Sequence, residues 1–336
     1  MLVKNRVLKR ICLAGTLILL GLVLVPLHAQ TAYAETNTAN VLKVSPLRTD
    51  VSVKPGESGI VKITVTNLTD KDITVRPYEN DFISGDEYGT PSIILDEDKF
   101  APTHSLKRFM APLQNVTIPA NKSKVVEVKI SVPGTTQAGG YFGALRFAPT
   151  TPDGGGQVNT SASVASLILL TVPGDLVEKL NLTQFEIQQG DKSATNFRTP
   201  NDLKVALRFE NKGNVQLAPF GKISVKKGDD VVYETDFNNK APSDTILPDG
   251  ARRWNVSLKN IGSFGHYTVS ATFTYGTKNQ SIDVTKSFWV IPTVVIIGVI
   301  VGFVLLIGLI AWLVFAIRKR QHQSRRSKKL SRSRLR

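Results

Sequence analysis

The segment Val61-Lys62-Ile63-Thr64-Val65-Thr66-Asn67 alternates apolar and polar residues and ends at an asparagine. A short polar turn follows, and a second alternating segment runs from Ile73 to Pro77. Period two with one apolar face is typical of a strand that covers a core on one side. The two segments therefore predict neighbouring strands of a β-sandwich.

The same arrangement returns later in the chain. A strand pattern ends at Asn211, a Lys-Gly turn follows, and residues 215–219 repeat the second segment. Strand patterns with turn signals between them continue up to residue 290, whereas helical periods are missing there. The sequence predicts an all-β fold of two tandem immunoglobulin-like sandwiches without disulfides, at residues 40–173 and 174–290.

Two tyrosines and one apolar run refine this prediction. Tyr141 and Tyr267 each follow a glycine by two residues at a strand start, which resembles a tyrosine corner. We expect each ring to pack under a sheet and each hydroxyl to bond nearby backbone. The run Val164–Val172 predicts an interior strand, with an exposed edge open to strand addition as the alternative.

The charge of the chain lies at its two ends. The 336 residues hold 42 Lys and Arg against 27 Asp and Glu, a net charge of +15. Residues 1–34 carry four basic residues and residues 318–336 carry ten, with no acids in either segment. The remainder is nearly neutral, so we expect a membrane topology and no nucleic-acid partner.

The N-terminal segment, residues 1–34, predicts a signal peptide. Its basic residues precede an uncharged run from Ile11 to Leu27, and Ala32-Tyr33-Ala34 is a small-x-small cleavage site. An uncleaved signal anchor is the alternative. The one cysteine, Cys12, lies in this segment, and an exported chain without disulfides is typical of a bacterial surface.

Residues 291–317 predict a transmembrane helix, because 27 residues without a charge can span a hydrocarbon core of about 30 Å. Basic residues stay cytoplasmic, so we expect a single-pass plasma-membrane protein with an extracellular N-terminus and a cytoplasmic tail at 318–336. The tail is expected to be disordered and to contact anionic lipid through Arg318, Lys319, Arg320, Arg325, Arg326, Lys328 and Lys329.

The first unit differs from the second mainly by extra residues at 84–110, called the insertion below. A sandwich should not need this segment to close its core, and function often lies on loops that a rigid scaffold positions. We expect it to cover a sheet edge or face and to form a partner surface, with a purely structural role as the alternative. The surface residues would be Asp86, Glu87, Ile93, Ile94, Leu95, Asp96 and Phe100.

Catalytic and metal-binding motifs are missing from the sequence. It contains no nucleophile elbow with a Ser-His-Asp order and no His-Glu-x-x-His. Acidic residues gather at Asp81, at Asp86-Glu87 and at residues 96–98, where calcium or a catalytic carboxylate pair would be the alternative to a solvated loop. The Asp-x-Asp-x-Asp-Gly spacing of a calcium loop is missing, so we expect no metal site. Because the catalytic motifs are missing too, we expect no enzyme and no cofactor.

Several turn and strand positions of the first unit form a recognisable framework: Pro55-Gly56-Glu57, Val65-Thr66-Asn67, Ile118-Pro119-Ala120 and residues 139–145. This framework resembles that of a bacterial surface family, DUF916, the peptidoglycan-binding half of WxL-interacting proteins. The second unit is similar in outline to the partner-binding half, at Leu247-Pro248, Gly265-His266-Tyr267 and Ser287-Phe288-Trp289. The resemblance implies a signal peptide, two sandwiches, one C-terminal membrane helix and a basic tail, and it implies cell-wall binding.

The sequence therefore predicts a membrane-anchored bacterial surface protein that binds cell wall (peptidoglycan) or another surface protein. The competing class is a single-pass receptor or a surface-assembly chaperone. A hydrolase that uses the acidic insertion is a third alternative. Neither the ligand nor the oligomeric state follows from the residues.

Overall fold

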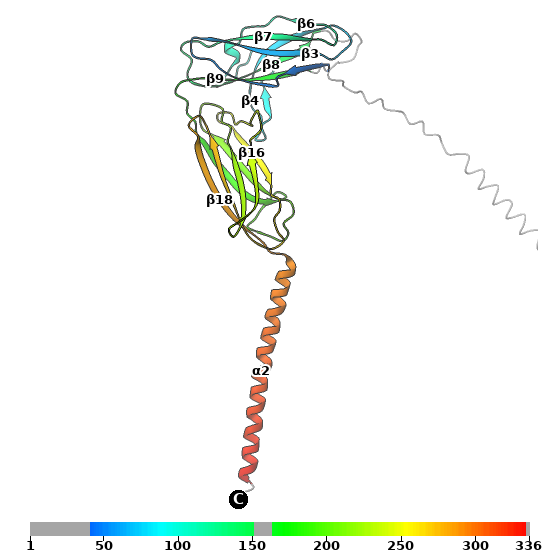
Figure 1. Cartoon of the computed structure of the whole chain (residues 1–336), viewed down its shortest axis with the longest axis vertical. Helices are drawn as coiled ribbons and strands as arrows, with labels where there is room; N and C mark the ends of the chain where they lie inside the picture. Colours follow the sequence, from blue (N-terminus) through cyan, green and yellow to red (C-terminus); the bar gives the residue numbers. More distant parts are fainter. Residues whose placement is uncertain (1–40, 151–162, 334–336) are drawn as a thin grey trace, which may run out of the picture. The chain divides into compact units, whose positions relative to one another are not determined.

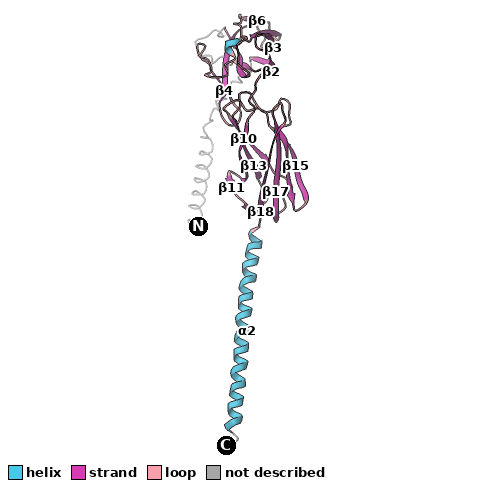
Figure 2. Ribbon diagram, turned by 90° about the vertical axis from the view of Figure 1, so that its left-hand side faces the viewer, coloured by secondary structure: helices cyan, strands magenta, loops and turns pink. Residues whose placement is uncertain are grey.

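The described chain is built mainly of β-strands, which are followed by one long C-terminal helix (Figure 2). The computed structural model describes residues 41–150 and 163–333, with helix side chains described up to Arg318. The expected signal peptide, residues 1–34, lies outside the described residues. The strands of the first half are β1 (Leu42–Ser45), β2 (Arg48–Ser52), β3 (Ser58–Asn67), β4 (Ile73–Ser84), β5 (Pro91–Ile93), β6 (Val116–Ile118), β7 (Ser123–Ser131), β8 (Gly139–Pro149) and β9 (Val164–Val172).

The first sandwich consists of two sheets (Figure 1). One has the order β1–β3–β7, and the other has the order β2–β9–β8–β4–β5, with β6 paired to β4. All these pairs are antiparallel except β2 with β9. Because β9 lies between β2 and β8, the predicted interior position of Val164–Val172 is confirmed.

Apolar residues at every second position of the strands in both sheets fill the core of the first sandwich. Val61, Ile63 and Val65 of β3 are buried, as period-two patterning predicted, and they pack in one cluster with β7, β8 and β9. Leu106 and Met110 of the insertion belong to the same cluster, with exposures of 0% and 8%. The expectation that the core closes without the insertion is therefore wrong, because its last residues fill space between the sheets.

The second sandwich has the same two-sheet construction. Its sheets have the orders β11–β10–β13–β16 and β12–β18–β17–β14–β15, around a second buried cluster. The elements are β10 (Leu180–Gln189), β11 (Lys192–Ser193), β12 (Asn196–Phe197), β13 (Leu203–Asn211), β14 (Phe220–Lys227), β15 (Asp230–Phe237), β16 (Ala251–Ser257), β17 (Gly265–Tyr275) and β18 (Gln280–Val290). The predicted all-β fold with one C-terminal helix is confirmed. The division at residues 173 and 174 stays a prediction.

A buried asparagine occupies the same place in each sandwich. Asn67 ends β3 and donates to the carbonyls of Lys71 at 2.7 Å and Ile118 at 3.1 Å. Asn211 ends β13 and donates to the carbonyls of Val215 at 2.7 Å and Ile246 at 2.9 Å. Both side chains are fully buried. The repeat seen in the sequence is thus also a repeat of hydrogen bonds, since each amide closes a turn and ties it to a second segment.

The two corner tyrosines also bond backbone. The Tyr141 hydroxyl donates to the carbonyl of Gln137 at 2.9 Å, and the Tyr267 hydroxyl donates to that of Gly262 at 3.3 Å. Tyr267 is buried and stacks on Phe288, whereas Tyr141 is half-buried and touches Phe109 edge to face. The assignment of both residues as tyrosine corners stays a prediction.

The C-terminal helix, α2 (Thr293–Ser333), differs from the expected 291–317 at both ends. It starts directly after Pro292, which suits a helix start because it has no N–H to donate. It continues through the basic segment, so the expected disorder is wrong over residues 318–333. Arg, Lys, Gln and Leu are good helix formers, and the helix therefore propagates beyond the apolar run. The segment Thr293–Arg318 is long and apolar enough to cross a membrane.

Replacing the buried amide should destabilise the sandwich that contains it. Asn211→Ala removes the donor to two buried carbonyls and should lower the free energy of unfolding by about 1–3 kcal/mol. Asn181→Ala, at an exposed position of β10, is the matched control and should change it little. Urea unfolding of both variants measures the difference, and equal effects would contradict a structural role for Asn211.

The corner bonds predict a smaller loss. Tyr141→Phe and Tyr267→Phe keep the ring but remove the hydroxyl, so each should cost about 0.5–1.5 kcal/mol in unfolding free energy. Thermal melts of the two variants test this. Unchanged melting in both would remove the tyrosine-corner assignment.

Candidate functional site

A buried carboxylate holds the insertion against the first sandwich. Asp81 on β4 is fully buried and accepts backbone N–H bonds from Ala101 and Lys107, each at 2.8 Å. The neighbouring Asn80 donates from its amide to the carbonyl of Ile94 at 2.8 Å. The middle of the insertion therefore follows one strand closely and has a defined position.

A second apolar cluster lies on the opposite face of the six-stranded sheet. Phe142 and Ala144 of β8 belong to it, whereas Leu145 and Phe147 of the same strand belong to the main core. The cluster also contains Phe82 and Leu169, and Ile93 of β5, Leu167 and Leu247 pack against it. Leu247 precedes β16, so this cluster joins the two sandwiches through apolar contact.

The predicted surface residues of the insertion have different roles. Ile93 and Ile94 are half-buried, whereas Leu95 and Phe100 are exposed. Asp86 accepts backbone N–H bonds from Tyr88 at 2.8 Å and Thr90 at 3.0 Å, and the Thr90 bond is the main cause of its lowered pKa.

Asp96 closes a separate turn in the insertion. Its carboxylate accepts the backbone N–H of Asp98 at 3.0 Å, which lowers its pKa, and it pairs with Lys99. Both aspartates therefore stabilise turns of the loop.

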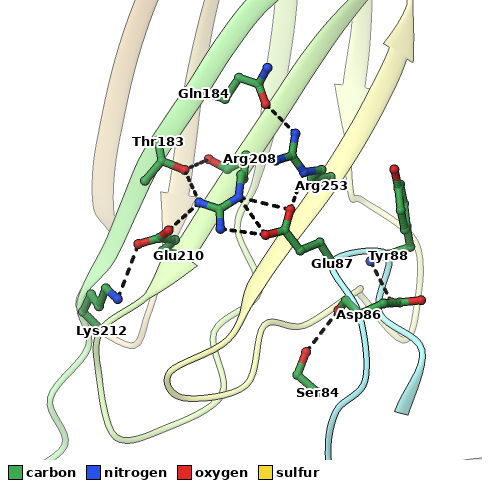
Figure 3. Close-up of polar contacts among 10 residues, drawn as sticks. All are labelled: Ser84, Asp86, Glu87, Tyr88, Thr183, Gln184, Arg208, Glu210, Lys212 and Arg253. Carbon is green, nitrogen blue, oxygen red and sulfur yellow. Dashed lines mark hydrogen bonds and ion pairs between the residues drawn. The ribbon is translucent and has the colours of Figure 1, made fainter. Parts of the chain in front are cut away.

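The side chain of Glu87 extends from the insertion to two arginines of the second sandwich (Figure 3). Its carboxylate accepts three bonds from the Arg208 guanidinium, at 2.7, 3.0 and 3.1 Å, and it also pairs with Arg253. The backbone N–H of Arg253 on β16 donates to the Glu87 carbonyl at 2.6 Å. We call these three residues the Glu87 clamp. It holds the insertion to the second sandwich by both side chain and backbone.

The clamp is part of a chain of alternating charges. Hydrogen bonds from Arg208 and then Arg253 lower the Glu87 pKa to about 2. Arg208 also pairs with Glu210, which pairs with Lys212 at 3.4 Å, and the two carboxylates raise the pKa of Arg208. Figure 3 shows Glu87 between the two arginines. Glu87 is only about a third exposed, which makes this pair stronger than a fully solvated one.

A cationic and aromatic surface lies elsewhere on the first sandwich. Arg146 of β8 faces Tyr78 of β4 in register, with its guanidinium 4.2 Å from the ring centroid. The Arg76 guanidinium lies 4.6 Å from the same ring and pairs with Glu97 of the insertion at 2.7 Å. We call Arg76, Tyr78 and Arg146 the Tyr78 face. Within the described residues, Arg146 makes no ion pair.

The insertion extends this surface with a second aromatic ring. Phe100 is exposed, and the guanidinium of Arg108 lies 4.4 Å from its centroid. Lys107 lies 4.9 Å from the same ring and donates to the carbonyl of Glu97, the partner of Arg76. The predicted surface residue Phe100 is therefore linked through Glu97 to the Tyr78 face, whereas Glu87 serves the clamp.

A cavity of about 400 Å³ is lined by residues of both sandwiches. Phe82, Leu167 and Leu169 form part of its apolar wall. Arg252 lines it as well and pairs with Asp244 at 3.0 Å, yet its buried Nε has no hydrogen-bond partner. The cavity therefore combines an apolar wall with a charged pair, Arg252 and Asp244.

Metal ligands do not gather in the described part of the chain. Within residues 41–150 and 163–318, no group of three His, Cys, Asp or Glu side chains is placed to hold a metal ion. The acidic groups at Asp81, Asp86 and Glu87 are instead engaged by backbone N–H groups or by arginines.

A comparison with known protein families gives a match over most of the first sandwich. Residues 49–149 match the family described as WxL Interacting Protein, peptidoglycan binding domain. The chain is similar to WxL-interacting surface proteins. The resemblance that the sequence predicted is confirmed over these residues, which include the Tyr78 face and the insertion. No curated protein matches the chain significantly.

Solved structures similar to the chain include pilus chaperones. One is titled a chaperone-tip adhesin complex of CFA/I fimbriae biogenesis, with 15% identity, a TM-score of 0.38, and coverage of 73% of this chain and 98% of that one. The class 5 fimbriae chaperone CfaA has 16% identity, a TM-score of 0.38, and coverage of 74% and 98%. The E. coli chaperone DraB has 14% identity, a TM-score of 0.33, and coverage of 74% and 96%. At these scores the likeness carries no functional argument.

Sequence reasoning missed the partners of the insertion. Arg208 on β13 is half-buried and Arg253 on β16 is exposed, and both lie on alternating strands, where a charged residue usually means only a solvated face. The contact between Tyr78 and Arg146 was missed as well, because it depends on the pairing of β4 with β8. The sequence offered one weak signal for the clamp, since Arg208 lies two residues from the opposite charge of Glu210 on the same strand.

The clamp predicts a specific dependence of stability on pH. The Glu87 pKa falls from 4.5 to about 2 on folding, so its stabilisation is complete above pH 4.5 and is lost as the pH falls towards 2. Glu87→Gln should therefore cost about 1 kcal/mol at pH 7, a value discounted for solvent exposure, and nothing near pH 2. Thermal unfolding of both proteins across this range measures the difference.

Glu57→Gln, an exposed glutamate in the turn before β3, is the matched control. It should leave the stability unchanged at both pH values. A Glu87→Gln difference that persists at pH 2 would contradict the role of the carboxylate.

Proposed function

We propose that this protein is a membrane-anchored surface protein that binds peptidoglycan through its first sandwich. The observation that carries the proposal is the match of residues 49–149 to a peptidoglycan-binding domain family. Such a function needs a binding surface and not a catalytic centre, which agrees with the binding character of that family.

The Tyr78 face is the surface that we assign to the polymer. Peptidoglycan consists of sugar chains and short peptides that carry carboxylates. Arginine pairs with carboxylates in a bidentate manner, and aromatic rings offer flat apolar area to sugar rings. Arg146 is free of carboxylate partners within the described residues, and the exposed Phe100 extends the surface. Arg146 and Phe100 both lie within the matched residues 49–149.

The C-terminal helix would supply the anchor. Thr293–Arg318 can span a bilayer, and the basic residues from Arg318 onward would keep that end in the cytoplasm. In this arrangement residues 35–290 face the cell wall, and the basic tail contacts anionic lipid of the inner leaflet. The signal peptide at 1–34 would direct export.

A second candidate is binding of another surface protein in the cavity between the sandwiches. The cavity offers an apolar wall, formed in part by Phe82, Leu167 and Leu169, against which an extended chain of a partner would pack. This would agree with a receptor or an assembly role. It predicts binding that depends on the cavity and not on the Tyr78 face.

Charge reversal at the Tyr78 face tests the first candidate. Arg146→Glu should lower retention of the protein on purified peptidoglycan sacculi by at least about tenfold, since it replaces attraction of carboxylates by repulsion. The readout is the fraction bound in a sedimentation assay, with thermal melting as the check on folding.

Lys129→Glu is the matched control, because it makes the same charge change at an exposed position of β7 in the other sheet. It should leave binding unchanged. Sacculi stripped of teichoic acid distinguish peptide carboxylates from polymer phosphates. Full binding by Arg146→Glu would move the site away from the Tyr78 face.

A further inference from the structure

Two exposed aromatic residues lie at the end of the second sandwich from which α2 leaves. Trp289 on β18 is 42% exposed, and Phe264 before β17 is 50% exposed. Only Ile291 and Pro292 separate the end of β18 at Val290 from the start of α2. Trp289 is therefore close to the candidate membrane span in the sequence, whereas Phe264 is not.

Strand register brings Phe264 to the same place. Gly265 pairs with Val290 and His266 pairs with Trp289 in the β17–β18 ladder, so Phe264 lies beside the exit of β18. The carbonyl of Phe264 accepts a bond from Lys227 at 3.1 Å, which adds the tip of the β14–β15 hairpin to this group. Val231 of that hairpin is 54% exposed. Three separate segments thus present apolar side chains at one end.

The orientation of Trp289 is supported by neighbouring residues. Its ring lies 4.7 Å from the imidazole of His266, and its backbone N–H donates to the carbonyl of Thr195 at 2.7 Å. Exposed tryptophans held in this way are costly in water, but they are favoured at the headgroup level of a bilayer, where an amphipathic ring suits both sides.

We propose that Phe264, Val231 and Trp289 form a foot that rests in the lipid headgroups of the outer leaflet. The proposal rests on the anchoring role of α2 in the proposed function. The two-residue link after β18 leaves little slack, so a spanning α2 brings the base of the sandwich to the bilayer surface. The contact is apolar in character, because Lys226 and Lys227 at the hairpin tip are offset by Asp229 and Asp230.

Spin labels at the two ends of one hairpin test the foot. The full chain with Cys12→Ser carries a single nitroxide after Ser263→Cys, next to Phe264, or after Lys278→Cys, in the turn at the other end of β17. The two sites lie beyond opposite ends of an 11-residue strand, which spans about 35 Å. Leu305→Cys, in the middle of the candidate span, reports whether α2 is inserted. Each protein is reconstituted into phosphatidylcholine vesicles.

Collision with a water-soluble nickel chelate and with oxygen measures the depth of each label. We expect the Leu305 label to be lipid-like, the Lys278 label to be fully accessible to nickel, and the Ser263 label to be several-fold less accessible to nickel than Lys278. Equal accessibility of Ser263 and Lys278, with Leu305 in lipid, would overturn the foot and leave the anchor intact. A nickel-accessible Leu305 label would overturn the anchor and the foot together.

A substitution separates the foot from the short link. Adding Phe264→Ser to the Ser263→Cys chain should raise nickel accessibility towards the Lys278 value. Phe220→Ser is the matched control, because Phe220 is 43% exposed and pairs with Thr274 at the far end of the same sheet. An unchanged Ser263 label after Phe264→Ser would show that the link alone holds the sandwich near lipid, which would overturn the assignment of Phe264.

Discussion

A buried asparagine amide closes the equivalent turn in both sandwiches, and the two-sheet arrangement of each depends on it. In each case the amide bonds a carbonyl of its own turn and a carbonyl of a segment far along the chain, Ile118 or Ile246. A chain with one cysteine cannot form an internal disulfide, so packing and such buried bonds must hold the sheets together. A lost buried partner costs more than the bond itself contributes, which makes the position intolerant to change.

The insertion has a structural role and also extends the surface that we propose for binding. Leu106 and Met110 complete the core, and Asp81 fixes the segment through two backbone N–H groups. Glu87 then reaches the second sandwich, where two arginines hold it. The insertion therefore positions both Glu87 in the clamp and Phe100, which is linked through Glu97 to the Tyr78 face.

The polar and apolar surfaces of the molecule suit different partners. The Tyr78 face and the neighbouring Phe100 combine cations with aromatic rings, which suits the anionic, sugar-containing polymer that we propose as the ligand. The foot at Phe264 and Trp289 is apolar, and it lies at the start of a helix that can cross a membrane. A surface protein that bridges membrane and wall needs one surface of each kind, and the two proposals assign them to different sandwiches.

The sequence by itself determined the strands, the repeat and the apolar helix, because period-two alternation and long uncharged runs are local properties of the chain. It predicted Asn67 and Asn211 as equivalent positions for the same reason. It failed for the insertion and its partners, since Glu87 and Arg208 are 121 residues apart and meet only when two sandwiches have formed. The pairing of Tyr78 with Arg146, and of Gly265 with Val290, depends on strand register. Such contacts between distant segments were decided by the tertiary structure, because no local pattern in the chain encodes which exposed residue will face another.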